Sequence, residues 1–513
     1  MTKRGTKAST SSDATDAATR APYIDLNQDR MTDSAMPAAA KSSRKARPSR
    51  PAPAADSADV PLGSQVRPEV HVPIPGPRGA AIVDADDRFL VRTTKTAPVT
   101  GVRGRGCVVE DADGNILLDF AAGIGVLNTG HCHPRVVAAV QEQAAKLMHF
   151  AGTDFYYDQQ TRLADKLDRL GAVHGRAKSF FCQSGTEANE AAIKLAKAYT
   201  RRPLLLAFHG AFHGRTQGSL ALTASKVRHK ERFFSPMPGV THVHYPNPYR
   251  NPWRIDGYAD PDELTNRAIE GMEAVFDNLV PADEVAAVFF EPVQGEGGYV
   301  VPPEGFARRL RKLCDEHDIL LVADEVQTGM GRTGRMLAME HSGVKADITS
   351  LAKALGSGMP IGATVCAQRI DFDESGRHSN TYGGNLVACA AAIATLDVLQ
   401  EEDLPGNAQR MGERMGKRLD ELREKHPEIG DARGLGLMRA VEFVKPGTQG
   451  RYGQPEPDAR LRDRVEEECW KRGLVLLGTG RSGVRFLPPL TVNGEQVDGA
   501  MDVFAEALQE AVR

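Results

Sequence analysis

Short apolar runs alternate with longer amphipathic stretches from about residue 100 onward. Apolar positions recur at helical spacing in EANEAAIKLAKAY (187–199) and in EGFARRLRKLCDEH (304–317). Continuous apolar strands separated by such helices predict an α/β fold whose large sheet is mainly parallel and covered on both faces. The candidate strands are SFFCQ (179–183), LLLAF (204–208), AAVFFEP (286–292), ILLVAD (319–324), DITSLA (347–352) and ATVCA (363–367).

The C-terminal part of the chain has a different pattern. RGLGLMRAVEF (433–443) and GVRFLPPLTV (483–492) have the pattern of strands, and the charged helix LRDRVEEECWKRG (461–473) lies between them. This pattern predicts a second, smaller α+β domain. We therefore expect a large domain over 131–395 and a C-terminal small domain over 396–513, which the segment 76–130 joins.

The first 75 residues differ from the rest in composition. They are rich in Ala, Ser, Thr, Asp, Arg and Pro and hold few large apolar side chains. Such a segment buries too little apolar surface to offset the entropy of ordering, so we expect residues 1–75 to be disordered.

Composition excludes several classes of function. The formal charge of −3 over 513 residues gives no basis for binding nucleic acid or a membrane surface. No apolar run approaches the roughly 20 residues that span a bilayer. The seven cysteines form no C-x-x-C pair, which argues against a disulfide framework or a structural metal site. We expect a cytoplasmic protein that binds small molecules and no metal.

Lys353 and Asp324 stand in unusual surroundings. Lys353 lies among Leu351, Ala352 and Leu355, and burial there would lower its pKa and make the amine a nucleophile. Asp324 ends an otherwise apolar strand. Taken singly, each is more often a surface lysine with a buried stem or a helix cap. Together they are the amine and the buried acid that a protein supplies to pyridoxal phosphate (PLP).

Three further segments carry candidate chemistry. Ser184, Gly185 and Thr186 precede a helix and could hold a phosphate, or simply cap that helix. Phe212 and Arg215, in HGAFHGRTQGS (209–219), could stack on a flat ring and bind a carboxylate, or lie in an ordinary polar turn.

The segment EPVQGEGGYVVPP (291–303) contains two acids in a glycine-rich stretch. Glu291 and Glu296 could act as an acid–base pair, or one of them could pair with an arginine.

The glycines of GMGRTG (329–334) match a dinucleotide-binding pattern. In a true site of that kind the glycines follow the strand directly, whereas here five residues intervene, Asp324 among them. A nicotinamide site is therefore disfavoured.

From about residue 100 to the C-terminus, the chain resembles the class III (ω-amino acid) PLP-dependent aminotransferases of fold type I, and its motifs are most similar to those of 4-aminobutyrate aminotransferases. Eight segments in the same order carry the resemblance, which makes it specific. They are LDFAAGIGVLNTGHCHP (118–134), SGTEANE (184–190), AFHGRT (211–216), EPVQGEGG (291–298), ADEVQTGMGRTG (323–334), SLAKALGSGMPIGA (350–363), NTYGGN (380–385) and GVRFLPPLT (483–491).

The resemblance implies a set of cofactor contacts. Lys353 would bond covalently to PLP and then move a proton, and Asp324 would pair with the ring nitrogen. Thr381 would reach the phosphate of the partner subunit, which implies a homodimer, or a dimer of dimers, with the active site at the interface. The other implied cofactor residues are Ser184, Gly185, Thr186, Phe212, His213, Val326 and Gln327.

The resemblance also implies how substrates bind. Arg485 would bind the α-carboxylate of the oxo acid, and Glu296 would pair with Arg485 while an ω-amine is bound. Arg215 would hold the distal carboxylate, and Ile124 stands where ornithine aminotransferases have a tyrosine. These residues favour transfer of an ω-amino group from a 4-aminobutyrate-like donor to 2-oxoglutarate.

Two alternatives remain open. One is an ornithine- or lysine-type ω-aminotransferase. The loop GTDFYYD (152–158), which lines the substrate entrance in members of the family, departs from the usual 4-aminobutyrate pattern. GEGGYVVPP and NTYGGN also resemble class III relatives that racemise amino acids, a reaction that needs the same PLP and lysine. A PLP-fold binding protein without activity is disfavoured because Lys353 and Asp324 are both present.

Overall fold

A seven-stranded sheet organises the region that holds most of the sequence motifs. The structure, a computed structural model, describes residues 61–233 and 237–513. The strand order is β4-β10-β9-β8-β7-β5-β6, and only β10 runs antiparallel to its neighbours. The strands are β4 (Ala177–Cys182), β5 (Leu204–Phe208), β6 (Val240–Val243), β7 (Val285–Phe290), β8 (Leu320–Asp324), β9 (Ile348–Leu351) and β10 (Gly362–Ala367). The mainly parallel α/β sheet predicted from the sequence is confirmed.

All six predicted strands of this sheet are present, and β6 was missed. β6 lies at the edge of the sheet and is half-buried over most of its length. Its sequence, VTHV, therefore lacks the continuous apolar run that identified the buried strands. β7 and β8 are buried at every position, which explains why their sequences were so easily recognised.

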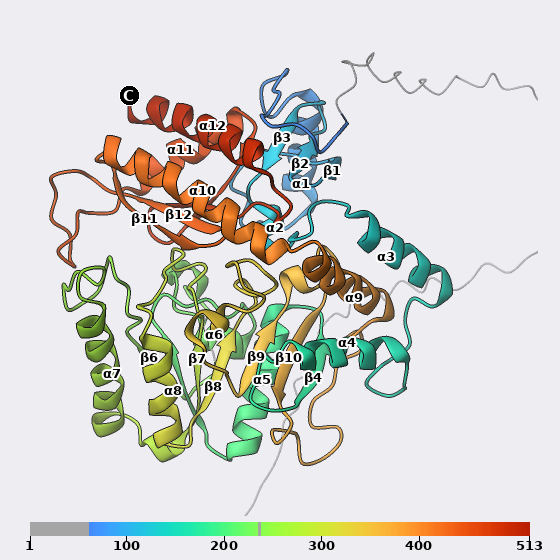
Figure 1. Cartoon of the computed structure of the whole chain (residues 1–513), viewed down its shortest axis with the longest axis vertical. Helices are drawn as coiled ribbons and strands as arrows, with labels where there is room; N and C mark the ends of the chain where they lie inside the picture. The colour runs from blue at the N-terminus through green and yellow to red at the C-terminus, as the bar shows by residue number, and fades with distance from the viewer. Residues whose placement is uncertain (1–60, 234–236) are drawn as a thin grey trace, which may run out of the picture. The chain divides into compact units, whose positions relative to one another are not determined.

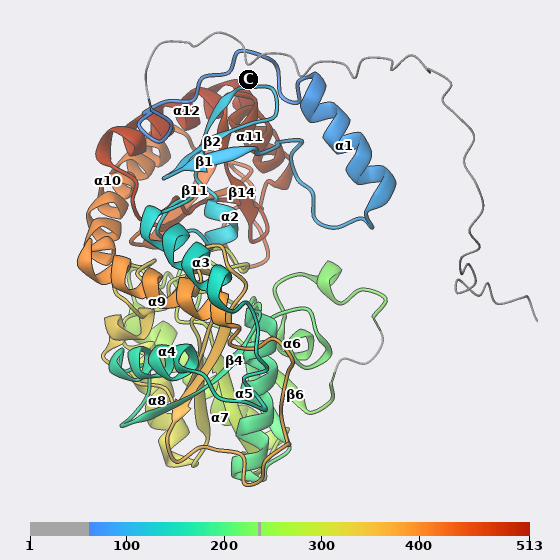
Figure 2. The ribbon, with the colours of Figure 1, turned by 90° about the vertical axis from the view of Figure 1, so that its right-hand side faces the viewer.

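Helices cover both faces of the large sheet (Figure 2), with α5 on one face and α8 on the other. Both were predicted from their periodicity. α5 begins at Gly185 because Ser184 caps it, its side chain accepting from the N–H of Glu187. The helices around this sheet are α4 (Asp158–Arg169), α5 (Gly185–Thr200), α6 (Gln217–Leu222), α7 (Pro261–Asn278), α8 (Phe306–Glu316) and α9 (Leu386–Glu401).

A four-stranded antiparallel sheet, order β11-β12-β15-β14, lies in the C-terminal part. The segment 433–443, expected as one strand, instead contains the turn of an antiparallel hairpin and parts of its two strands, β11 and β12. The turn forms at Gly436, which adopts a φ of +52° between them. The expected strand 483–492 ends at Phe486, since Pro488 and Pro489 cannot donate to a ladder. The strands are β11 (Ile429–Leu435), β12 (Met438–Phe443), β14 (Leu477–Thr479) and β15 (Gly483–Phe486).

The segment before residue 130 shares a third sheet with the C-terminal part. β3 pairs with β13 in parallel, Leu118 opposite Leu474. The strands are β1 (Arg103–Arg105), β2 (Val108–Glu110), β3 (Ile116–Asp119) and β13 (Leu474–Val475). The remaining helices are α1 (Pro77–Phe89), α2 (Ala122–Gly125), α3 (Pro134–Lys146), α10 (Leu404–Lys425), α11 (Ala459–Lys471) and α12 (Gly494–Val512), with short 3₁₀ turns η1 (Val227–His229), η2 (Ala282–Glu284), η3 (Ala338–Ser342) and η4 (Lys353–Leu355).

The predicted disordered tail, 1–75, lies for the most part outside the described residues. Residues 61–75 are described and ordered, which corrects that end of the prediction. The backbone of Glu69 pairs with Ile116, and the Gln496 amide donates to the carbonyl of Gly63. These residues are held by backbone pairing, which a count of apolar side chains does not detect. Val60–Arg513 form one compact unit, and the domain limits at 131 and 396 stay a prediction.

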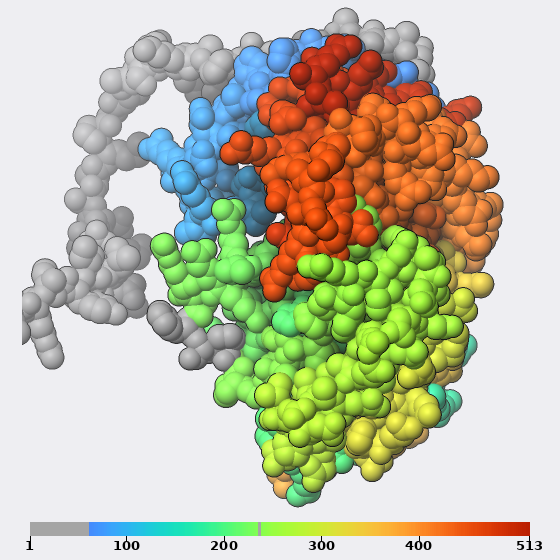
Figure 3. Space-filling view, turned by 90° about the vertical axis from the view of Figure 1, so that its left-hand side faces the viewer, coloured from blue at the N-terminus to red at the C-terminus, as the bar shows by residue number. Residues whose placement is uncertain are grey.

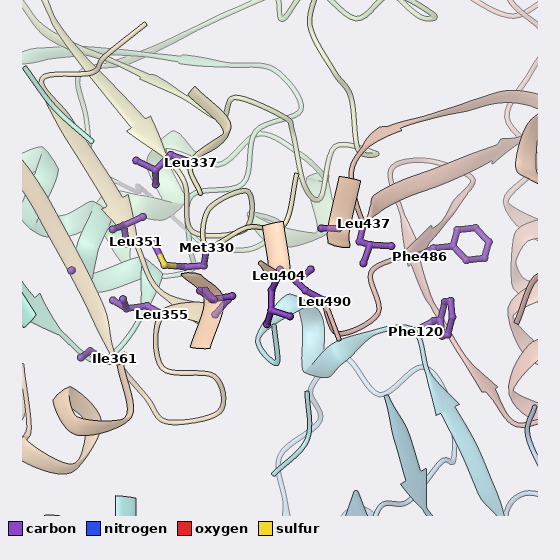
Figure 4. Packing of buried hydrophobic residues seen from close by; sticks show 14 of the residues in the cluster. Phe120, Met330, Leu337, Leu351, Leu355, Ile361, Leu404, Leu437, Phe486 and Leu490 are labelled. Carbon is purple, nitrogen blue, oxygen red and sulfur yellow. The ribbon is translucent and has the colours of Figure 1, made fainter. Parts of the chain in front are cut away.

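The hydrophobic core runs without a break from the large sheet to the C-terminal sheet (Figure 4). Leu351 and Leu355 lie at one end, Leu404 in the middle, and Phe486 and Phe120 at the other. On the surface, the orange-red residues around 440–460 lie against the green residues around 240–280 (Figure 3). None of the helices in the described residues combines the length and apolar character needed to cross a bilayer.

Candidate active site

A cavity of about 390 Å³ opens beyond the carboxyl ends of the central parallel strands. In open α/β sheets this edge is where ligands bind. Besides Glu291, ten of the residues singled out from the sequence line it. They are Ser184, Gly185, Thr186, Phe212, His213, Arg215, Asp324, Val326, Gln327 and Lys353.

Asp324 lies at the end of β8 and is 4% exposed. Its Oδ2 accepts hydrogen bonds from Nδ1 of His213 at 2.7 Å and from Nδ2 of Asn189 at 2.8 Å. Burial alone would lower the pKa of His213, but the hydrogen bond to Asp324 and the charge of that carboxylate outweigh it and raise the pKa. The network holds the carboxylate in a fixed orientation while Asp324 still lines the cavity.

Lys353 follows β9 with a φ of +45°, a left-handed conformation that is unusual for a side chain of this size. Burial lowers the pKa of its amine to about 8, helped by the positive charge of Arg485 and opposed by Glu296 and Asp324. Within the described part of the chain, the amine makes no hydrogen bond or ion pair. The amine therefore lies buried and unpaired at the cavity wall with a lowered pKa, and its role as a nucleophile stays a prediction.

The turn at the start of α5 has the features of an anion site. The N–H groups of a helix's first turn have no acceptor within the helix, and the helix dipole is positive there. A Cβ at Gly185 would lie 2.6 Å from the side chain of Val326, and a Cβ at Gly214 would lie 2.1 Å from Oγ1 of Thr186. The two glycines thus keep open a cradle that larger residues would fill.

Buried polar atoms in the cavity lack partners of their own. Oε1 of Gln327 and Nε2 of His213 are buried with no hydrogen-bond partner among the described residues. Phe212 and Val326 line the same cavity with apolar surface. A free amine, a fixed carboxylate, an anion cradle and apolar faces together fit a flat, phosphorylated heteroaromatic group.

Glu296 and Arg485, far apart in the sequence, form a buried ion pair. Oε1 of Glu296 accepts from Nη1 of Arg485 at 2.7 Å. Burial alone would raise the pKa of Glu296, but Arg485 and Lys226 lower it to about 2. Glu296 is thus the acid of the 291–303 segment that pairs with an arginine.

Five predicted residues differ from the other site residues: Glu296 and Arg485 are not among the residues that line this cavity, and Arg215, Ile124 and Thr381 are exposed. Arg215 lines it but is exposed, its guanidinium 5.7 Å from the centre of the Phe212 ring. Ile124 is 48% exposed in a left-handed turn, and its neighbour Val126 lines the cavity instead. Thr381 is exposed and away from the cavity of its own chain.

Asn189 was not predicted to have a role in the site, whereas Glu291 was offered from the sequence as one of an acid–base pair. Asn189 binds Asp324, and the signal was an amide on the apolar face of α5, beside Ala188 and Ala192. Glu291 accepts from the N–H groups of Phe212 and Gly295, and burial raises its pKa to about 7. It joins the two loops that carry Phe212 and Glu296.

The glycine-rich segment 329–334, which matches a dinucleotide-binding pattern, has a structural role. Arg332, inside it, is fully buried, and its guanidinium donates to the carbonyls of Leu437 and Pro488 and to the side chain of Asn128. The segment therefore binds the C-terminal sheet region to the large sheet and offers no open turn to a dinucleotide.

Residues 90–508 match the family model described as aminotransferase class-III. The chain belongs to the class III aminotransferases. Among curated relatives, an alanine/serine racemase of Pyrococcus horikoshii is 40% identical over 453 residues, 87% of this chain and 93% of that protein. The 4-aminobutyrate aminotransferase of Escherichia coli is 39% identical, over 81% of this chain and 94% of that protein.

Solved structures agree with this assignment. An amine transaminase from an uncultivated Pseudomonas species, in its PLP-bound form, matches with a TM-score of 0.77 and 32% identity, covering 83% of this chain and 99% of that chain. An (S)-enantioselective ω-transaminase of Thermomicrobium roseum matches with a TM-score of 0.78 and 30% identity, covering 85% and 99%. The class III aminotransferase described here is thus a PLP-dependent transaminase that acts on amino and oxo acids.

Proposed function

We propose that this aminotransferase moves the ω-amino group of a 4-aminobutyrate-like donor to 2-oxoglutarate. The observation that carries the proposal is the closed ion pair between Glu296 and Arg485. An ω-amine has no carboxylate beside its reacting carbon, so an unpaired arginine there would be a buried charge without a partner. Glu296 neutralises Arg485 for that donor, and the α-carboxylate of an oxo acid replaces Glu296 in the second half of the reaction.

The other end of the substrate meets Arg215. Its guanidinium is exposed at the cavity and lies near the Phe212 ring. A planar guanidinium binds a carboxylate through two parallel hydrogen bonds, which suits the distal carboxylate of both 4-aminobutyrate and 2-oxoglutarate. Ile124 presents an exposed apolar side chain, which fits a donor that lacks an α-amino group.

The residues of this chain divide the chemistry among them. When bound, PLP supplies an electron sink for the carbon that carries the amino group. Lys353 takes a proton from that carbon and returns it, a task suited to an amine whose pKa is about 8. Asp324 keeps the ring nitrogen protonated, Gln327 bonds the ring oxygen, and Phe212 and Val326 enclose the ring. Ser184, Gly185 and Thr186 hold the phosphate.

The active form we infer is a homodimer, or a dimer of dimers, with Thr381 at the partner's phosphate. Support comes from exposed apolar side chains beside the Thr381 loop: Met148, Phe150, Phe155, Tyr156 and Tyr382 are each more than 40% exposed. The rings of His149 and Tyr382 lie 5.1 Å apart, which joins the two segments into one surface. Contiguous apolar surface of this kind is typical of a protein–protein interface.

A second candidate is amino-acid racemisation on the same scaffold. The observation that favours it is the 40% identity to a racemase over 87% of this chain. Racemisation uses the same lysine and cofactor but returns the proton to the opposite face, without release of an oxo acid.

One pair of assays separates the two activities. The purified enzyme, incubated with 4-aminobutyrate and 2-oxoglutarate, should form glutamate. Incubation with single L-amino acids and no oxo acid, followed by chiral analysis, should leave the L-form unchanged. Absence of glutamate from every ω-amine, together with D-amino acid from an L-substrate, would establish the racemase instead.

A further inference from the structure

Glu296 lies between two cations that come from different parts of the fold. Its Oε1 pairs with Nη1 of Arg485 at 2.7 Å, and its Oε2 lies 3.5 Å from Nζ of Lys226. Arg485 is on β15 in the C-terminal sheet, whereas Lys226 directly precedes η1 beside the large sheet. The side chain of Arg485 is 6% exposed and that of Lys226 is 34% exposed. The carboxylate thus has a second positive partner that is independent of Arg485.

The backbone of Lys226 is fixed in place. Its carbonyl accepts from the N–H of His229 at 3.1 Å, and the ring of His229 bonds to Oγ of Ser225 at 3.1 Å. Nζ of Lys230 donates to the carbonyl of Ala221, which ties this turn to the end of α6. Lys226 therefore extends from a rigid turn, and its side chain can follow Glu296 over a short distance without movement of the backbone.

An exchange of partners at Arg485 creates an electrostatic problem. When an α-carboxylate binds Arg485, the carboxylate of Glu296 leaves that arginine and remains beside a second anion. An unpaired carboxylate in a largely buried site is strongly disfavoured. Lys226 is already within ion-pair distance, so it can keep Glu296 neutralised while Arg485 changes partner.

We propose that Lys226 is the receiving cation of Glu296, a positioning residue that holds the displaced carboxylate whenever an α-carboxylate occupies Arg485. The inference rests on the proposed exchange at Arg485. It adds the residue that neutralises the Glu296 carboxylate during that exchange. It assigns Lys226 to the half-reaction with 2-oxoglutarate. A lysine that instead bound the distal carboxylate would act in both half-reactions, because both substrates carry one.

The two half-reactions of the PLP-loaded enzyme, measured separately, test this assignment. Lys226→Met removes the charge and keeps an apolar side chain of similar length. We expect the half-saturating concentration of 2-oxoglutarate to rise about five- to tenfold, in line with loss of a partly exposed ion pair, and that of 4-aminobutyrate to change less than about twofold. Lys226→Arg should restore most of the loss. Arg228→Met, which removes an exposed charge two residues away, is the matched control and should behave as wild type.

A double variant adds a readout that a merely structural role would not affect. In a Glu296→Gln background no carboxylate needs a receiving cation, so Lys226→Met should have no further effect on 2-oxoglutarate. A loss that persists in that background, or an equal loss with 4-aminobutyrate, overturns the proposal.

The proposed function fails by a different result, namely a wild-type enzyme that does not react with any ω-amine. In that case the comparison is made with L-alanine, whose α-carboxylate also needs Arg485. Lys226→Met should then raise the half-saturating concentration of L-alanine by the factor expected for 2-oxoglutarate. An unchanged half-saturating concentration of L-alanine overturns the assignment of Lys226.

Discussion

Nδ1 of His213 donates a 2.7 Å hydrogen bond to Oδ2 of Asp324 in the interior of the active site. Both side chains are almost completely buried. The hydrogen bond to Asp324 and the charge of that carboxylate outweigh burial and raise the pKa of His213, which favours the imidazole as the donor of this pair. Asn189 donates to the same oxygen, and the other carboxylate oxygen, Oδ1, accepts from the N–H of Val326 at 3.1 Å, so the carboxylate is held on both sides.

Asp324→Asn should cut transamination severely while the fold is retained. A neutral amide cannot hold the ring nitrogen protonated, so we expect turnover to fall at least roughly 100-fold, the usual loss for a fixed electrostatic group at a reacting centre. Steady-state turnover and the melting temperature are the measurements. Asp277→Asn, at an exposed position of α7, is the control. Near-normal turnover in Asp324→Asn would mean that this carboxylate does not serve the ring.

The amine of Lys353 should titrate well below the ordinary value for a lysine. Burial holds its pKa at about 8, below the ordinary 10.5, so the neutral, reactive amine accumulates as the pH rises through about 8. Competitive acetylation of the enzyme stripped of cofactor, read by mass spectrometry, should show this midpoint for Lys353. A Lys353 midpoint at the ordinary lysine value of 10.5 contradicts the burial of the amine.

Removal of the lysine gives a second test of the same residue. Lys353→Ala should retain PLP only noncovalently, so borohydride should no longer fix the cofactor to the chain, and turnover should fall by roughly 1,000-fold or more because no group moves the proton. Lys345→Ala, at an exposed position, should leave both properties unchanged. Covalent labelling of Lys353→Ala by cofactor and borohydride would place the reactive lysine elsewhere.

Gly214→Ala should weaken PLP binding more than it weakens the fold. Gly214 has a φ of +136°, and the new Cβ would lie 2.1 Å from Oγ1 of Thr186 and 2.4 Å from Oγ of Ser219. Relief of that clash must move the hydroxyl groups around the phosphate cradle. We expect the dissociation constant for PLP, measured by fluorescence titration, to rise at least about tenfold. Gly305→Ala, where a Cβ meets nothing within 4 Å, is the control.

The residues that sequence could identify share a local signal. Lys353 and Asp324 stand out because a charged group interrupts an apolar segment, and Ser184, Gly185 and Thr186 because small polar residues join a strand to a helix. The large sheet was recognised because its central strands are buried along their whole length. The edge strand β6 was missed because three of its four residues are only partly buried.

Relationships across long separations carried no such signal. The pairing of Glu296 with Arg485 came only from the family resemblance, since 189 positions separate them. The contact between Lys226 and Glu296 was not foreseen at all, because a lysine in a polar loop is ordinary. The ordered segment 61–75 was missed for a similar reason, since its backbone pairs with β3 while its composition resembles a tail.

Glu296→Gln should change which amines the enzyme accepts. The amide cannot neutralise Arg485, so an ω-amine would meet an unpaired buried cation, while an α-amino acid would supply its own carboxylate. We expect the ratio of kcat/KM for 4-aminobutyrate to that for L-glutamate to fall about tenfold or more. Glu304→Gln, an exposed acid that follows the same loop, should leave the ratio unchanged.

The pH dependence of that ratio gives an independent check. Arg485 and Lys226 hold the pKa of Glu296 at about 2. Glu296 is therefore fully charged, and its ion pair with Arg485 fully stabilising, above the ordinary pKa of 4.5. Both are lost only as the pH falls through about 2. In the wild type the substrate ratio should therefore show no titration by Glu296 between about pH 6 and 9. A loss of ω-amine preference with a midpoint inside that range, absent from Glu296→Gln, would show that Glu296 is not held as an ion pair.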